Sequence, residues 1–205
     1  MKTEANDKQE LILEAAIRRF SHFGVGKTTM TEIADDVALT KQSLAYYFAD
    51  KQSLVIAVVE LIINQYLQEV EQNCLTAASV EEALLQLTEI KKSFFERYYM
   101  LYLQNRNHDL KIGANELLNV KEKINASETN LLIRLLQRGM EKGEIRPIDV
   151  QKTSMLVLQT LTAFEVCLKS EKAFPDHQDF IEMNEKQKAV LHLFINGLKV
   201  AGANA

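Results

Sequence analysis

The stretch TMTEIADDVALTKQSLAYYF, residues 29–48, predicts two short helices joined by a tight turn. Thr29 is a suitable residue for a helix N-cap, because its hydroxyl can accept a hydrogen bond from a free backbone N–H of the first turn. Glu32 follows three residues later, which is the spacing of a capping box. The apolar stripe of this first helix consists of Ile33, Ala34 and Val37. A helix of about two turns is marginal alone, so packing must hold it.

The second helix of this stretch begins after Thr40 and is anchored on its inner side by Leu44 and Phe48. The remaining residues point outward or sideways: Lys41, Gln42, Ser43, Ala45, Tyr46 and Tyr47. Lysine and hydroxyl groups can bind phosphates, and glutamine can pair with the edge of adenine. This face suits DNA, although an ordinary solvated helical hairpin would show the same pattern.

Residues 10–54 resemble the DNA-binding domain of the TetR family of transcriptional repressors. The resemblance is carried by AAIRRFSHFG, residues 15–24, and by TTMTEIADDVALTKQSLAYYFADKQSL, residues 28–54. Three departures from the family pattern occur, one at the turn between the two helices and two on the second helix. Ala38 and Gln42 stand where the family often has glycine, and Ala45 and Tyr47 replace a frequent tyrosine and histidine. These departures bear on base preference and leave the core positions intact.

The resemblance implies a dimer that places two recognition helices in successive major grooves of a near-palindromic operator. Gln42 and Ser43 are the candidates for base reading. The candidates for contact with the DNA backbone are Lys27, Thr28, Thr29, Thr40, Lys41, Tyr46, Tyr47 and Lys51.

The composition favours an all-α chain, because Gly and Pro are sparse among 205 residues and almost half of the residues are apolar. The net charge of −4 does not indicate a nucleic-acid partner, so the argument for DNA rests on where the charged residues fall in the sequence. The polar N-terminus does not resemble a signal peptide, and no uninterrupted apolar run is long enough for a membrane span. The two cysteines are expected to be reduced. A cytoplasmic protein without cofactor or metal is therefore predicted.

We expect residues 1–50 to form the DNA-binding domain and residues 51–205 to form a helical domain for ligand binding and dimerisation. A long helix is predicted from Lys51 to about Cys74, and the resemblance implies that it transmits ligand binding to the recognition helices. A rigid linker is the alternative.

A band of aromatic side chains marks the next predicted helix, which runs from Ser79 to about Arg106. Such a band can line a cavity for an apolar or aromatic effector, or it can simply fill a core. The candidate ligand-binding residues are Tyr66, Phe94, Tyr98, Tyr99, Tyr102 and Arg106.

Three further helices are predicted after this band, over about 115–142, 149–169 and 184–200. The first is expected to be interrupted near 125–127, and residues 173–183 are expected to form a loop around Pro175. The last two helices are apolar on more than one face, which predicts that they pair with their mates in a homodimer.

The segment GVGKTT, residues 24–29, resembles a phosphate loop and raises the alternative of an ATPase. A phosphate loop must follow a β-strand, whereas the preceding residues predict an amphipathic helix. No nucleophile motif and no metal-ligand spacing occurs, so we expect a ligand-responsive repressor that is not an enzyme. A DNA-binding regulator without a small ligand, controlled by a protein partner or acting as an activator, is a second alternative.

Overall fold

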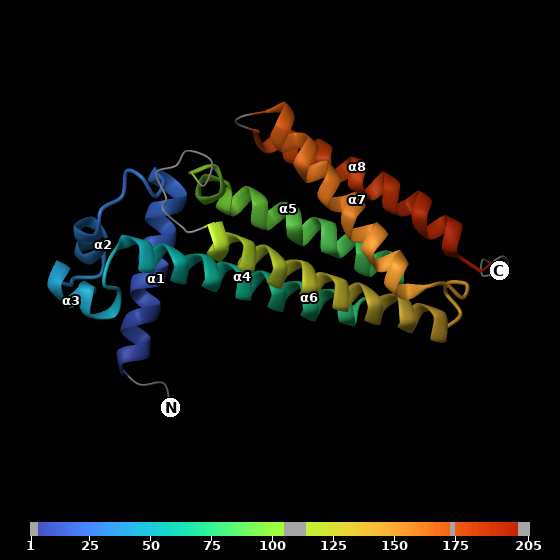
Figure 1. The fold of residues 1–205 in the computed structure, drawn as a ribbon, viewed down its shortest axis with the longest axis horizontal. Helices are drawn as coiled ribbons and strands as arrows, with labels where there is room; N and C mark the ends of the chain where they lie inside the picture. The colour runs from blue at the N-terminus through green and yellow to red at the C-terminus, as the bar shows by residue number, and fades with distance from the viewer. Residues whose placement is uncertain (1–3, 105–113, 173–174, 201–205) are drawn as a thin grey trace. The chain divides into compact units, whose positions relative to one another are not determined.

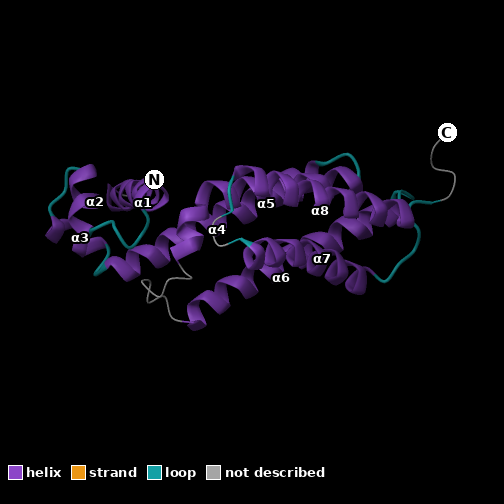
Figure 2. Cartoon of the chain, turned by 90° about the horizontal axis from the view of Figure 1, so that it is seen from above, coloured by secondary structure: helices purple, strands orange, loops and turns teal. Residues whose placement is uncertain are grey.

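The computed structural model describes the backbone of residues 4–104, 114–172 and 175–200. These residues form α-helices and no strand, which confirms the all-α prediction (Figures 1 and 2). The helices are α1 (Glu4–Phe23), α2 (Met30–Asp36), α3 (Lys41–Tyr47), α4 (Lys51–Thr76), α5 (Val80–Gln104), α6 (Ala114–Glu141), α7 (Val150–Glu171) and α8 (His177–Leu198).

The chain divides into two compact units. Unit 1 consists of Met1–Asn64 and Arg97–Val120, and unit 2 consists of Gln65–Glu96 and Lys121–Ala205. The core of unit 1 is formed by apolar side chains from α1, α2, α3 and the start of α4. Its largest fully buried members are Ile12, Phe20, Ile33, Leu44 and Leu54.

Unit 2 has its own core, in which leucines from α5, α6 and α7 are buried together with Ile195 of α8. Two boundary predictions are wrong here. α6 continues through residues 125–127, because Glu128, Leu131 and Leu132 are all buried on its inner side. α8 begins at His177 and not at residue 184, because Asp176 and Asp179 form a capping box directly after Pro175.

Helix α4 is long and apolar enough to cross a membrane by length and composition alone. The same composition is required of a helix that contributes to two cores, since Leu54 and Val58 are buried in unit 1 and Val70 and Cys74 in unit 2. Such helices in soluble proteins pass the same test, so α4 is weak evidence for a membrane span.

Both cysteines are free thiols, in agreement with the sequence prediction. Cys74 of α4 is buried, and burial together with the nearby charge of Glu128 raises the pKa of its thiol to about 11. Cys167 of α7 is exposed.

Gly139 of α6 packs directly against Val80 at the start of α5. A Cβ atom added at Gly139 would lie 2.3 Å from Cγ2 of Val80, whose stiff side chain is 1% exposed. We expect Gly139→Ala to lower the free energy of unfolding by about 1–3 kcal/mol, as overpacking generally does. Urea denaturation followed by circular dichroism measures this loss.

The matched control is the same substitution in a Val80→Ala background, where the clashing atom is absent. There Gly139→Ala should cost little, because alanine favours a helix more than glycine does. An equal cost in both backgrounds would contradict the packing explanation.

Candidate nucleic-acid interface

The first helix of the predicted pair is capped as the sequence predicts. The hydroxyl of Thr29 accepts a hydrogen bond from the N–H of Glu32 at 3.2 Å, and the N–H of Thr29 donates to the Glu32 carboxylate at 2.7 Å. The Glu32 carboxylate accepts from the N–H of Thr29 and also from its hydroxyl, at 2.8 Å, and these two hydrogen bonds lower the pKa of Glu32. The reciprocal pair satisfies free N–H groups of α2 and fixes where this short helix begins.

The turn between α2 and α3 places Ala38 in the left-handed region, with φ of +53°. Glycine adopts this conformation without the strain that a Cβ atom introduces. The turn is closed by a hydrogen bond from the N–H of Leu39 to the carbonyl of Ala34 at 2.9 Å. The chain therefore holds the tight turn despite the alanine.

Helix α3 turns one side to the core and the other to solvent. Leu44 is fully buried and Phe48 is 5% exposed, whereas Tyr46 is 85% exposed. The other outward residues are Lys41, Gln42, Ser43 and Ala45, all of which are exposed. Tyr47 is half-buried against the core, with its ring edge-on to that of Tyr46. The outward side is thus a short polar and aromatic surface on a helix that the core holds in place.

Two hydroxyl groups of this surface are already hydrogen-bonded. The Thr40 hydroxyl accepts from the N–H of Ser43 at 3.0 Å, and the two side-chain oxygens lie 2.9 Å apart. The Ser43 hydroxyl can therefore donate to a base only when it is not donating to Thr40, although its oxygen keeps acceptor capacity. Gln42 has no such constraint in its exposed position.

The candidate DNA-binding residues of the loop before α2 differ in exposure, since some lie at the surface and one is buried. Lys27 and Thr29 are exposed. Lys51 donates a hydrogen bond to the carbonyl of Gly26 at 3.3 Å, which ties the start of α4 to this loop. Thr28 is 1% exposed and donates to the carbonyl of Gly24 at 2.9 Å. The burial of Thr28 argues against a direct DNA contact by its side chain.

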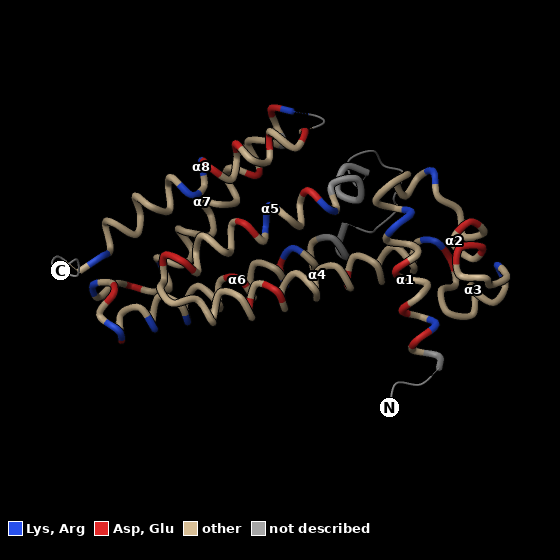
Figure 3. Tube along the Cα trace, turned by 180° about the vertical axis from the view of Figure 1, so that it is seen from behind, with Lys and Arg blue, Asp and Glu red and all other residues tan. Residues whose placement is uncertain are grey.

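An ion pair between Arg19 and Asp36 connects α1 to α2, the first helix of the helical pair. Arg19 donates from Nε and Nη2 to both carboxylate oxygens of Asp36, at 2.6 and 2.8 Å, and also lies 3.4 Å from Glu32. Figure 3 shows the acidic residues of α2 close to α1. The hydrogen bonds from Arg19 lower the pKa of Asp36. The stability that the charged Asp36 adds to the fold is therefore fully present above the usual pKa of aspartate. It is lost as the pH falls through the lowered pKa of Asp36 in the folded protein.

Comparison with known proteins matches residues 12–58 to the family of bacterial regulatory proteins described as the tetR family. The regulator RutR of Escherichia coli K12, an HTH-type transcriptional regulator, is 30% identical over 153 residues, which cover 73% of this chain and 70% of RutR. This chain belongs to the TetR family. It is accordingly a helix-turn-helix transcriptional regulator that binds DNA.

Two other relatives extend the similarity of this TetR-family chain. The uncharacterised HTH-type regulator YhgD of Bacillus subtilis is 24% identical over 77% of this chain and 82% of its own length. A crystal structure of a transcriptional regulator from Cytophaga hutchinsonii aligns with a TM-score of 0.83 at 24% identity, over 93% of this chain and 98% of that chain. The fold of both units is therefore shared with a solved regulator.

The predicted ligand-binding residues of this TetR-family protein do not form one described cluster. In unit 2, the rings of Tyr66 and Phe94 meet edge to face at 5.2 Å, and both residues are buried. Tyr98 is half-buried against the core of unit 1, at a break in α5 where φ is −113° and ψ is 16°. The side chains of Tyr99 and Tyr102, and all of Arg106, lie outside the described residues.

A buried polar cluster in unit 2 was not foreseen from the sequence. Lys91 of α5 binds both oxygens of Glu128 of α6 at 3.0 Å and lies 3.4 Å from Glu165 of α7. Tyr66 of α4 donates its hydroxyl to Glu128. All four residues are less than 10% exposed. One side chain from each of four helices thus meets in the interior, and spacing within a single helix gives no signal of this.

Burial and charge act together on this cluster, which we call the Lys91 cluster (Tyr66, Lys91, Glu128 and Glu165). Burial opposes the charge of Lys91, but Glu165 and Glu128 raise its pKa, so the ammonium stays protonated. Burial and the charge of Glu128 raise the pKa of Tyr66 well above its usual value. Tyr66 therefore acts as a neutral hydrogen-bond donor.

Proposed function

We propose that this regulator is a repressor that binds a near-palindromic operator as a homodimer and is released by a small apolar or aromatic effector. The observation that carries the proposal is the outward side of α3, where polar side chains are exposed on a helix whose opposite side is buried. Residues 1–50 would supply the DNA-binding domain. Residues 51–205 would supply ligand binding and dimerisation, in a cytoplasmic protein.

Gln42 is the leading candidate for base reading, because its amide can pair with adenine in the major groove. Ser43 is the second, once its hydroxyl turns toward the DNA. Phosphate contacts would come from exposed or half-buried residues that surround the recognition helix: Lys27, Thr29, Thr40, Lys41, Tyr46, Tyr47 and Lys51.

Exposed apolar side chains on the last two helices support dimerisation through α7 and α8. Leu156 of α7 is 45% exposed and Leu193 of α8 is 74% exposed. Large apolar side chains that stay exposed on two helices in this way are typical of a surface for association. A two-fold dimer would present two copies of α3 to successive major grooves.

Release by an effector requires that the effector bind more tightly to a dimer conformation that does not fit the operator. Helix α4 would link the two states, since it contributes to the cores of both units. Control by a protein partner, or action as an activator, remains the alternative. The ATPase alternative loses support because residues 4–23, which precede Gly24, form a helix where a phosphate loop needs a strand.

We expect Gln42→Ala to relax discrimination at one base pair of the operator and to cost about 1–3 kcal/mol of binding free energy there. The measurement is fluorescence anisotropy with an operator obtained by selection from random DNA, followed by a set of operators that each carry one base change. Lys41→Ala is the matched control on the neighbouring residue. It should weaken binding to all of these sequences equally and reduce the dependence on salt.

A uniform loss for Gln42→Ala would assign this residue to the DNA backbone and remove it from base reading. Failure of the wild-type dimer to bind any selected duplex would contradict the proposed function as a whole.

A further inference from the structure

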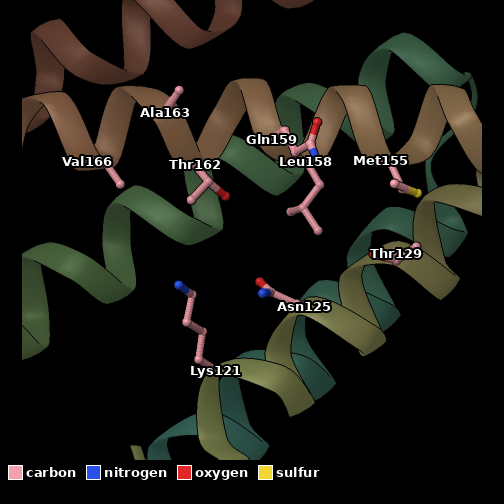
Figure 4. Close-up of a pocket in the computed structure, with 9 residues that line it drawn as sticks. All are labelled: Lys121, Asn125, Thr129, Met155, Leu158, Gln159, Thr162, Ala163 and Val166. Atoms are coloured by element: carbon pink, nitrogen blue, oxygen red, sulfur yellow. The ribbon is translucent and has the colours of Figure 1, made fainter. Parts of the chain in front are cut away.

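A cavity of about 430 Å³ lies between α6 and α7 of unit 2 (Figure 4), and its lining does not include the described candidates Tyr66, Phe94 and Tyr98. This volume lies in the range of pockets that hold small molecules. The residues that line it are Lys121, Asn125, Thr129, Met155, Leu158, Gln159, Thr162, Ala163 and Val166. Most of them are exposed or half-buried, so the cavity opens to solvent.

The α6 side of the cavity carries its polar end. Lys121 and Asn125 are one helical turn apart and therefore share a face, and Figure 4 shows both side chains pointing from α6 toward α7. Lys121 is the only charged residue among the nine that line the cavity. Within the part of the chain that the structure describes, its ammonium has no ion pair. This end therefore offers a positive charge and a neighbouring amide donor.

The α7 side of the cavity is mainly apolar. Met155, Leu158, Ala163 and Val166 line it, and Leu158 points into the space between the helices in Figure 4. The flexible thioether of Met155 can adapt to apolar bodies of different shape. The polar members of this wall, Gln159 and Thr162, are uncharged, as is Thr129 on the α6 side. The cavity thus pairs one cationic end with an apolar wall.

The nearest buried acids do not reverse this charge. Glu128 and Glu165 stand on the same two helices, but neither lines the cavity. Lys91 contacts both carboxylates inside the core. One lysine and two carboxylates leave one negative charge in excess, but that charge lies inside the core, so the charged group that a molecule in the cavity would contact is Lys121.

We propose that this cavity binds a monocarboxylate with an apolar body, with its carboxylate at Lys121 and Asn125 and its body against α7. A charge-assisted hydrogen bond from lysine gives this preference, because such bonds are stronger than neutral ones. This inference names the chemical class of the effector. Binding in the cavity does not depend on the proposed function, but any effect of that binding on DNA rests on it.

The test compares three probes with the same eight-carbon chain: octanoate, octan-1-ol and octylammonium. Isothermal titration calorimetry of the full-length protein measures their affinities without DNA, below the micelle concentrations of octanoate and octylammonium and below the solubility limit of octan-1-ol. We expect octanoate to bind at least about ten-fold more tightly than octan-1-ol, as one charge-assisted contact provides. Octylammonium should bind weakest. Octylammonium binding as tightly as octanoate, or no binding by any probe, would overturn the proposal.

Variants of Lys121 separate charge from shape. Lys121→Met should lower the affinity for octanoate about ten-fold or more and leave octan-1-ol nearly unchanged, whereas Lys121→Arg should keep the preference. Lys123→Met, an exposed position on the same helix that does not line the cavity, is the matched control and should change nothing. Unchanged octanoate affinity in Lys121→Met would place the ligand elsewhere.

A separate measurement keeps the two proposals distinguishable. Octanoate is added to the complex of the protein with its selected operator, and anisotropy reports release. Binding without release would leave the cavity assignment standing and refute the effector role. Release of DNA by octanoate that persists in Lys121→Met would refute the cavity assignment and support ligand control.

Discussion

Lys91→Met is expected to lower the free energy of unfolding by about 3–5 kcal/mol, because it leaves two buried carboxylates without their positive partner. Lys91 contacts Glu128 at 3.0 Å and Glu165 at 3.4 Å, and all three side chains are buried. Methionine matches the length and apolar stem of lysine, so the change removes the charge with little change in volume. Urea denaturation at pH 7 measures the loss.

Two companion variants test whether the charges act as this geometry requires. Glu128→Gln should also be costly, because Glu128 accepts hydrogen bonds from Tyr66 and Lys91. Glu165→Gln should cost least, because Glu165 has one buried oxygen without a hydrogen bond and its removal leaves Lys91 and Glu128 as a neutral pair. A stability of Lys91→Met equal to that of wild type would show that the cluster does not hold these charges when folded.

Leu44→Ala is expected to lower the free energy of unfolding by about 2–5 kcal/mol and to abolish operator binding. Leu44 is fully buried and, with Phe48, joins the seven-residue helix α3 to the core of unit 1. A helix of this length has little stability of its own, so loss of its anchor frees the recognition surface. Urea denaturation and fluorescence anisotropy with operator DNA measure the two effects.

Tyr46→Ala is the matched control on the same helix. Tyr46 is 85% exposed, so its truncation should change the free energy of unfolding by less than about 0.5 kcal/mol. It should nevertheless weaken DNA binding if Tyr46 contacts phosphate. Equal stability losses for Leu44→Ala and Tyr46→Ala would contradict the orientation of α3.

The helical pair of unit 1 could be predicted from sequence because its signals are local. The capping box of Thr29 and Glu32, the N-cap of Thr40 and the inward side of Leu44 all depend on residues within one or two helical turns. The two-bond ion pair between Arg19 and Asp36 could not be predicted, because 17 residues separate the two side chains in the sequence. Local patterns do not report which distant side chain lies opposite.

Unit 2 was less predictable for the same reason. The Lys91 cluster joins four helices, so its members look like ordinary solvated charges in each helix taken alone. The cavity beside Lys121 forms between α6 and α7, and its lining shows no motif in either helix. The aromatic band was visible in the sequence, but of its described residues Tyr98 packs against the core of unit 1 and Phe94 is buried in unit 2.

The unequal environments of the two cysteines have a practical consequence. The thiol of Cys74 is buried and stays protonated at neutral pH, so maleimide reagents should react only with the exposed Cys167. The natural chain can thus carry a single spin label or fluorophore on α7 without any mutation. In a two-fold assembly that label would occur twice, and the spacing between the two copies could be followed by pulsed spin resonance as DNA or a small molecule is added.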